Sequence, residues 1–377
     1  MPTGPLHGGS RPARRAGSHR PSAGSSFFLI SLLSHPLMSN PASSASQSLV
    51  RPLAVAEFKP FTLVRRSRGI DLYEIAHGRK KTVIERLRVK AATRAFRRLQ
   101  RAGQPSLGVA RSEGLGREFS FDARNTQFHA IYEYAEKGYE IDVMGAILTF
   151  LPADGVFVDV GANWGYFALA VAASPHFNGR VLAFEAFPPS FADLDGIRSQ
   201  LQIDGARLQA EAMALSRSEG TAYLGVGNGQ YSGLIKVSSE QTGVAVPKKP
   251  LDAFALARLD VMKIDVEGHE LDVLEGAAAT LERCRPVICL ENWFDIEREQ
   301  GTRELAALEF LADRDYSLFI PALTDASGQP VLLDLRRTQA AELFLRGMPF
   351  VPSQRGFFDK RVNVLAIPRE RAHELPC

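Results

Sequence analysis

Residues 156–165 read VFVDVGANWG, an almost continuously apolar run that passes directly into a bend with two glycines. A longer apolar run at residues 166–173 follows without a gap. A short apolar run bounded by glycine is typical of a buried strand, and the longer run is typical of a buried helix. Ligands of open α/β sheets bind beyond the carboxyl ends of the strands, so the bend at residues 159–165 is predicted to be a binding site.

The alternation of strands and helices continues downstream. Nearly continuous apolar strands that are separated by helices predict a parallel sheet covered by helices on both faces. Two late segments, set apart by a longer stretch, predict an antiparallel pair that closes the sheet. The further strands are expected at residues 180–185, 208–215, 261–265 and 287–291, and the late pair at residues 316–320 and 361–367.

The second predicted strand ends in an acid, Glu185, 24 residues after Gly161. A carboxylate at this place can accept hydrogen bonds from the two hydroxyls of a ribose, which implies a nucleoside-containing cofactor. Dinucleotide sites use the spacing G-x-G-x-x-G to hold a pyrophosphate, whereas residues 159–165 have the spacing D-x-G-x-x-x-G. The anion Asp159 would repel a pyrophosphate and suits the cationic amino and sulfonium groups of S-adenosylmethionine. The residues therefore favour S-adenosylmethionine, and NAD remains the alternative.

A second block carries a more specific signal. Residues 259–277 read LDVMKIDVEGHELDVLEGA and lead into RPVICLEN at residues 285–292. Together with DVGANWGY at residues 159–166 and AFEA at residues 183–186, this block resembles the FkbM family of S-adenosylmethionine-dependent methyltransferases. The resemblance covers roughly residues 120–295.

The resemblance implies a class I methyltransferase fold, with a seven-stranded, mostly parallel sheet that contains one reversed strand. It also implies methyl transfer, commonly to a hydroxyl oxygen of a sugar or a polyketide-like product. The pair Tyr139 and Glu140 looks like a family feature just ahead of the first strand. Two positions depart from the family pattern: Ala186 stands where a proline usually follows the ribose-binding acid, and His269 stands at a small-residue position.

Three polar residues at the end of the strand predicted for residues 261–265 are candidates for a catalytic base, namely Asp265, Glu267 and His269. A methyl transfer to oxygen needs an in-line approach, and a weakly acidic hydroxyl benefits from a base within hydrogen-bond reach. Helix capping explains Glu267 equally well, and His269 could merely face solvent. A divalent metal on Asp265, Glu267 and Glu291 is conceivable, but three acids without a clear octahedral set lead us to expect no metal.

The expected cofactor contacts come from the glycine bend, the ribose acid and the end of the third strand, where an adenine ring would pass. Asp265 is added because a strand-end carboxylate points into the crevice. The family resemblance adds the pair ahead of the first strand. The expected residues are Asp159, Gly161, Ala162, Asn163, Gly165, Glu185, Ala186, Met213, Ala214, Asp265, Tyr139 and Glu140.

Charge divides the chain into two parts. Residues 1–150 hold 23 Lys and Arg against 11 Asp and Glu, whereas residues 151–377 hold 22 against 31. We expect a disordered tail at residues 1–50, a basic helical segment at residues 51–115 and the methyltransferase domain at residues 116–377. Over the 377 residues, 45% hydrophobic and 23% charged residues exclude a disordered chain for most of the length.

The tail leaves two alternatives open. Arg14 and Arg15 precede a short apolar stretch at residues 27–33, as in an export signal, and Met38 could be the true initiator in place of Met1. No apolar run reaches the roughly 20 residues of a membrane span. The three cysteines form no regular framework, so we expect a cytoplasmic protein.

Residues 82–101 predict a basic amphipathic helix whose apolar positions pack and whose basic positions face outward. It is either an ordinary surface helix or a peripheral contact with an anionic membrane surface. Few aromatic residues accompany the charges, so no nucleic acid is expected, and the expected partner is a small-molecule or glycan acceptor; the oligomeric state stays open. A membrane-surface or complex-anchoring protein with an inactive methyltransferase-like fold is a further alternative. The apolar positions are Ile84, Leu87, Ala91, Ala95 and Leu99, and the basic ones are Arg86, Lys90, Arg94, Arg97, Arg98 and Arg101.

Overall fold

The structure is a computed structural model that describes residues 51–78, 80, 82–225, 236–237, 243–294, 299–358 and 361–376. The expected tail, the export signal and the alternative start therefore lie outside the described residues. All described residues fall within one compact unit. No helix among them combines the length and the apolar composition that crossing a lipid bilayer requires.

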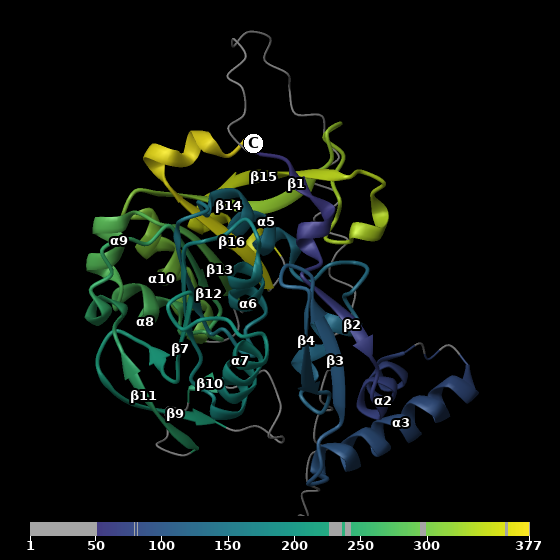
Figure 1. The fold of residues 1–377 in the computed structure, drawn as a ribbon. Helices are drawn as coiled ribbons and strands as arrows, with labels where there is room; N and C mark the ends of the chain where they lie inside the picture. Colours follow the sequence, from purple (N-terminus) through teal and green to yellow (C-terminus); the bar gives the residue numbers. More distant parts are fainter. Residues whose placement is uncertain are drawn as a thin grey trace, which may run out of the picture. The chain divides into compact units, whose positions relative to one another are not determined.

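Nine of the described strands form one central sheet (Figure 1). In sheet order they are β1 (Leu53–Ala54), β15 (Glu342–Phe350), β14 (Tyr316–Thr324), β16 (Arg361–Pro368), β13 (Val287–Trp293), β12 (Val261–Ile264), β5 (Val156–Val160), β6 (Arg180–Phe184) and β7 (Leu208–Glu211). The run from β13 to β7 is parallel throughout. β16 lies antiparallel to both β13 and β14, and β15 lies antiparallel to β14 and β1.

The expected α/β fold around a mostly parallel sheet is confirmed, and the late segments form the expected antiparallel pair, β14 with β16. The expected seven strands with one reversed strand need correction. The described sheet has nine strands, and β15 and β16 both run against the rest. The two additional strands are β1 and β15, which pair with each other through Leu53 and Leu343.

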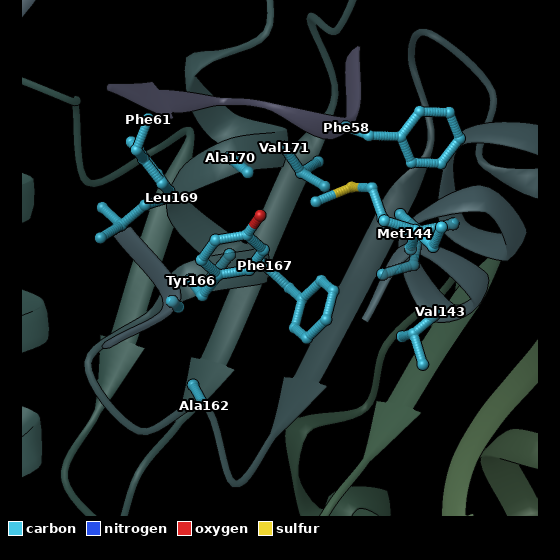
Figure 2. Packing of buried hydrophobic residues seen from close by; sticks show 14 of the residues in the cluster. Phe58, Phe61, Val143, Met144, Ala162, Tyr166, Phe167, Leu169, Ala170 and Val171 are labelled. Carbon is cyan, nitrogen blue, oxygen red and sulfur yellow. The ribbon is translucent and has the colours of Figure 1, made fainter. Parts of the chain in front are cut away.

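Helices cover both faces of the central sheet, and alternate residues of β5 supply the two faces. Phe157 packs on the side of α5, α6 and α7, whereas Val158 and Val160 pack on the side of α8, α9 and α10. Figure 2 shows side chains of α5 and α6, among them Met144 and Phe167, in the first of these layers. The bounds are α5 (Ile141–Phe150), α6 (Tyr166–Ala173), α7 (Pro188–Gln200), α8 (Glu270–Glu275), α9 (Ala278–Cys284) and α10 (Glu299–Ala312).

Two smaller sheets and the remaining helices complete the described fold. One small sheet consists of β2 (Phe61–Arg65), β3 (Leu107–Ser112) and β4 (Arg117–Asp122), and the other of β8 (Ala214–Leu215), β9 (Gly220–Gly225), β10 (Lys236–Val237) and β11 (Val244–Lys249). The remaining helices are α2 (Arg68–His77), α3 (Val83–Arg101) and α4 (His129–Tyr132). The 3-10 helices are η1 (Val55–Phe58), η2 (Thr126–Phe128), η3 (Leu251–Phe254), η4 (Leu335–Arg337), η5 (Pro352–Phe357) and η6 (Arg369–Glu374).

The N-terminal segment is part of the same unit as the methyltransferase-like sheet. The boundary that we expected at residue 116 falls inside the hairpin of β3 and β4. An aromatic cluster joins this hairpin to the bend after β5, because Phe61 of β2 contacts the rings of Phe119, Trp164 and Tyr166. The segment at residues 51–115 is therefore not only helical, and it supplies core to the rest of the fold.

Helix α3 begins and ends where the sequence predicts. Thr82 caps it, since its hydroxyl accepts a hydrogen bond from the backbone of Glu85 and the Glu85 carboxylate accepts one from the backbone of Thr82. This reciprocal pair satisfies two of the backbone donors that a helix start leaves open.

The face that α3 buries is not the predicted one. Val89, Ala92 and Phe96 are buried, and the ring of Phe96 packs edge-on against Tyr73 of α2. Three of the five positions that we expected to pack are exposed instead, and two of these, Ile84 and Leu87, have exposed fractions of 71% and 62%. The contact with α2 selects the other side of the helix, which leaves an apolar stripe uncovered.

Candidate functional site

The carboxyl ends of three neighbouring strands meet at the glycine bend. The backbone N–H groups of Gly161 and Ala162 both donate to the carbonyl oxygen of Phe184, at 2.9 and 3.0 Å, where β6 ends. On the other side, the backbone N–H of Asp265 donates to the carbonyl oxygen of Val160 at 3.0 Å. The bend thus lies at the edge of the sheet where ligands of α/β proteins bind.

The two glycines of the bend are required by the protein's own packing. Gly161 has φ of 74°, and a Cβ there would collide with the carbonyl oxygen of Asp265. Gly165 has φ of 90°, and a Cβ there would collide with the side chain of Leu194. The protein itself fills the position that a Cβ would take at each glycine, so both glycines are explained without a ligand.

Glu185 lies at the end of β6 with its carboxylate turned toward the bend. Its Oε2 accepts the backbone N–H of Asn163 at 2.7 Å, and its Oε1 accepts the backbone N–H of Phe187 at 2.7 Å. Each carboxylate oxygen has two lone-pair sites, so one site on each oxygen remains for a further donor. Burial raises the pKa of Glu185 to about 7, although the two backbone donors act in the opposite direction.

A buried lysine, Lys263, lies between two of the acids, and the sequence analysis gave it no role. Its Nζ is 3.2 Å from Oδ2 of Asp265 and 3.8 Å from Oδ1 of Asp159, and it lies over the ring of Phe167. Burial alone would lower the pKa of Lys263, but the carboxylates of Asp265 and Asp159 outweigh it and raise that pKa. A lysine inside an apolar strand, two residues before an acid, is the signal that could have found this contact.

Asp159 is completely buried, and its carboxylate contacts both helix α6 and Lys263. Its Oδ2 accepts the backbone N–H of Ala168 in α6 at 3.1 Å. Its Oδ1 has no hydrogen-bond partner among the described residues and faces Lys263. We expected this anion to lie next to a ligand, whereas these two contacts connect helix α6 and Lys263 to β5.

A second cluster consists of two acids, Glu140 and Glu291, and the basic residue Arg361. Sequence reasoning also missed Arg361. This arginine on β16 pairs with Oε1 of Glu140 at 3.1 Å and contacts the carboxylate of Glu291. The indole N–H of Trp293 donates to Oε2 of Glu291 at 2.8 Å. Burial raises the pKa of Glu140 to about 7 and raises the pKa of Glu291 well above its ordinary value. Arg361 lies more than 60 residues after β13, so no local pattern connects it with these acids.

The structure brings two of the three base candidates together with Glu291. Carboxylate oxygens of Asp265, Glu267 and Glu291 all lie within 4.8 Å of one another. Hard divalent cations accept such ligands. Arginine and lysine side chains already face Glu291 and Asp265, so the cluster alone does not define a metal centre, and the absence of a metal stays a prediction.

The third candidate, His269, is held from one side. Its Nδ1 lies 3.0 Å from Oδ2 of Asp272, and Oδ1 of Asp272 accepts the Nε of Arg217 at 2.7 Å. A carboxylate that fixes one ring nitrogen orients the imidazole and selects its tautomer. This arrangement is compatible with a base that uses Nε2, and the side chain keeps an exposed fraction of 23%.

The other expected cofactor residues are half-buried around the bend. Tyr139 packs its ring against Tyr166, with the ring centroids 4.9 Å apart. Met213 lies between β7 and β8 against the α8 side of the core, and Ala214 begins β8. Ala186 packs beside Phe187 in a small apolar cluster. Their roles toward a ligand stay predictions.

The site carries more acidic than basic side chains. Burial raises the pKa of three of the acids, Glu140, Glu185 and Glu291. A cation bound among them would favour their ionised forms, and the low-dielectric surroundings strengthen that attraction. The acids are Glu140, Asp159, Glu185, Asp265, Glu267 and Glu291, and the cations are Lys263 and Arg361.

Residues 159–318 match the family model of the methyltransferase FkbM domain, which confirms the resemblance found in the sequence. The matched region extends from β5 into β14. Methyltransferase 1 of Beauveria bassiana (strain ARSEF 2860) is 28% identical in a match that covers 38% of this chain and 66% of that protein. The chain thus spans just under two thirds of this relative's length.

Two solved structures resemble the chain only distantly. The methyltransferase FkbM from Methylobacillus flagellatus KT has a TM-score of 0.37 at 14% identity, over 68% of this chain and 58% of that chain. The O-methyltransferase from Bacillus cereus in complex with SAH has a TM-score of 0.35 at 13% identity, over 73% of this chain and 97% of that chain. Scores this low carry no argument about function, which rests on the domain match and on the site.

The raised pKa of Glu185 predicts a pH-dependent difference between the wild type and Glu185→Gln. The folded state holds the carboxyl proton up to about pH 7, and the unfolded state releases it near 4.5, so stability falls as pH rises through this window. The difference between the two pKa values corresponds to a change in the free energy of unfolding of at most roughly 3 kcal/mol. Urea unfolding without ligand should therefore show that Glu185→Gln is more stable, relative to the wild type, at pH 8 than at pH 5.

The control is Glu370→Gln, because hydrogen bonds from Arg285 lower the pKa of Glu370 to about 2, below the range tested. This variant should keep a nearly constant offset from the wild type. A constant offset for Glu185→Gln as well would contradict the burial of an ionisable Glu185.

Proposed function

We propose that this chain transfers a methyl group from S-adenosylmethionine to a hydroxyl oxygen of a sugar-containing or secondary-metabolite acceptor. The observation that carries the proposal is the Glu185 carboxylate, which is buried and turned toward the bend between β5 and α6. The FkbM domain match over residues 159–318 supports the methyltransferase class. The alternatives, an NAD-dependent oxidoreductase and an inactive anchoring protein, gain no support from these observations.

The residues of the bend fit a cationic nucleoside cofactor. The remaining lone pairs of Glu185 suit the two hydroxyls of a ribose, and the excess of carboxylates suits a cation. When bound, S-adenosylmethionine supplies a methyl group attached to a positively charged sulfur. Asp159 and Lys263 keep the ends of β5 and β12 in register, and Asp265 remains half-exposed at the strand end.

The acceptor side of the site needs a group that takes the hydroxyl proton. Asp265, Glu267 and His269 remain our candidates, and their positions after β12 place them at the same edge of the sheet as the bend. We add Glu291, since its carboxylate lies within 4.8 Å of the first two and burial raises its pKa, which makes its deprotonated form a stronger base.

Saturating S-adenosylmethionine should raise the melting temperature of the wild type, and Glu185→Ala should abolish the rise because it removes the ribose acceptor. At about 100 times the dissociation constant the stabilisation should be roughly 2.7 kcal/mol. Differential scanning fluorimetry with and without the cofactor measures both values.

Glu185→Ala also leaves the backbone N–H groups of Asn163 and Phe187 without their acceptor, so the variant needs a matched control. Asp252 likewise accepts two backbone N–H groups, from Ala279 and Thr280, but belongs to η3 rather than to the bend. Asp252→Ala should melt lower and keep the full cofactor-dependent rise. No rise in the wild type would defeat the proposal, and a rise with NADH alone would favour the oxidoreductase.

The acceptor class is tested by incubating the protein with methyl-labelled S-adenosylmethionine and an extract of its own cells. We expect the label on a small molecule or glycan, bonded to oxygen and resistant to mild alkali, as an ether is. Glu185→Ala should leave the extract unlabelled. Label on protein or nucleic acid, or bonded to nitrogen or sulfur, would exclude the proposed acceptor while keeping methyl transfer.

A further inference from the structure

The outward face of α3 exposes large apolar side chains at its N-terminal end. Val83, Ile84 and Leu87 have exposed fractions of 69%, 71% and 62%. The helix packs through the opposite side, where Val89 and Phe96 are buried, and Figure 1 shows it lying beside α2. Because Thr82 and Glu85 cap the helix start, these apolar residues belong to an ordered turn rather than to a fraying end.

Basic side chains surround the apolar residues along the same helix. Arg94 and Arg98 follow Leu87 by seven and eleven residues, so all three lie along one face of the helix. Arg86 reaches the backbone carbonyl of Lys80, and the further basic residues have no ion pair within the described part of the chain. These exposed basic residues are Arg88, Lys90, Arg94, Arg97, Arg98 and Arg101.

We propose that this face, the α3 face, docks on an anionic phospholipid surface. Apolar side chains enter the headgroup boundary while neighbouring cations bind lipid phosphates and carboxylates, which is the composition of interfacial helices. Lysine and arginine stems also lie along apolar surface while their charged ends stay at the headgroups. The inference concerns attachment and is independent of the reaction at the glycine bend.

Charge and side-chain type exclude the other simple occupants. A second copy that offered the same face would bring two sets of cations together, and like charges at close range repel. Residues 1–50 of this chain contain no Asp or Glu, so they offer no anions to neutralise the face. A single-stranded nucleic acid is anionic, but its bases stack on exposed aromatic rings, and the exposed large residues of α3 are aliphatic.

Vesicle sedimentation with the full chain tests the proposal. The protein should pellet with vesicles of phosphatidylcholine and phosphatidylserine, much less with phosphatidylcholine alone, and less as salt screens the charges. Arg94→Glu with Arg98→Glu should weaken the partition by about tenfold or more. Ile84→Gln with Leu87→Gln should also weaken it, and both pairs of residues are exposed, so folding is retained.

The matched control reverses the same number of charges elsewhere. Arg336→Glu with Arg337→Glu changes η4, where both side chains are 59% exposed, and should sediment like the wild type. Equal binding to neutral and anionic vesicles, no binding, or an undiminished partition of the Arg94 and Arg98 variant would overturn the proposal. So would retention by a single-stranded oligonucleotide without vesicle binding, or self-association of the free protein that the α3 variants abolish.

Discussion

The site depends on one buried ion-pair group, Lys263 between Asp159 and Asp265. A buried ammonium is costly to desolvate, and removing one of its carboxylates would leave an uncompensated charge. Its two partners stand at the ends of β5 and β12, so the lysine fixes the relative position of these strands. The glycine bend uses that position, because Gly161 lies directly against the carbonyl of Asp265.

Acidic side chains outnumber basic ones at the candidate site, and this excess determines which ligand charge the site favours. The two cations pair with only some of the acids, and burial raises the pKa of Glu185, which pairs with neither of them. A cationic ligand would favour the ionised form of this acid, whereas a pyrophosphate would disfavour it. The same reasoning distinguishes the two charged regions of the chain: the acidic strand ends suit a cation, and the basic α3 face suits an anionic surface.

The parts of the fold that local pattern determines could be predicted from the sequence. Residues 156–160 and 166–173 form β5 and α6 as expected, because both runs are apolar apart from Asp159 and are bounded by glycine or turn residues. The buried face of α3 could not be predicted, since two faces of the helix carry apolar residues and only the contact of Phe96 with α2 chooses between them. Arg361 was missed for a similar reason: its place beside Glu140 depends on strand pairing between distant segments. Local periodicity therefore located the bend, and long-range packing determined which charges surround it.

The most direct test of the central claim is a crystal structure of the chain with S-adenosylhomocysteine, the neutral product that would remain after methyl transfer. The account predicts the ribose hydroxyls hydrogen-bonded to the carboxylate of Glu185, with the backbone contacts to Asn163 and Phe187 retained. A nucleoside bound elsewhere, or a carboxylate that keeps only its two backbone donors while the ligand lies beside it, would contradict the account.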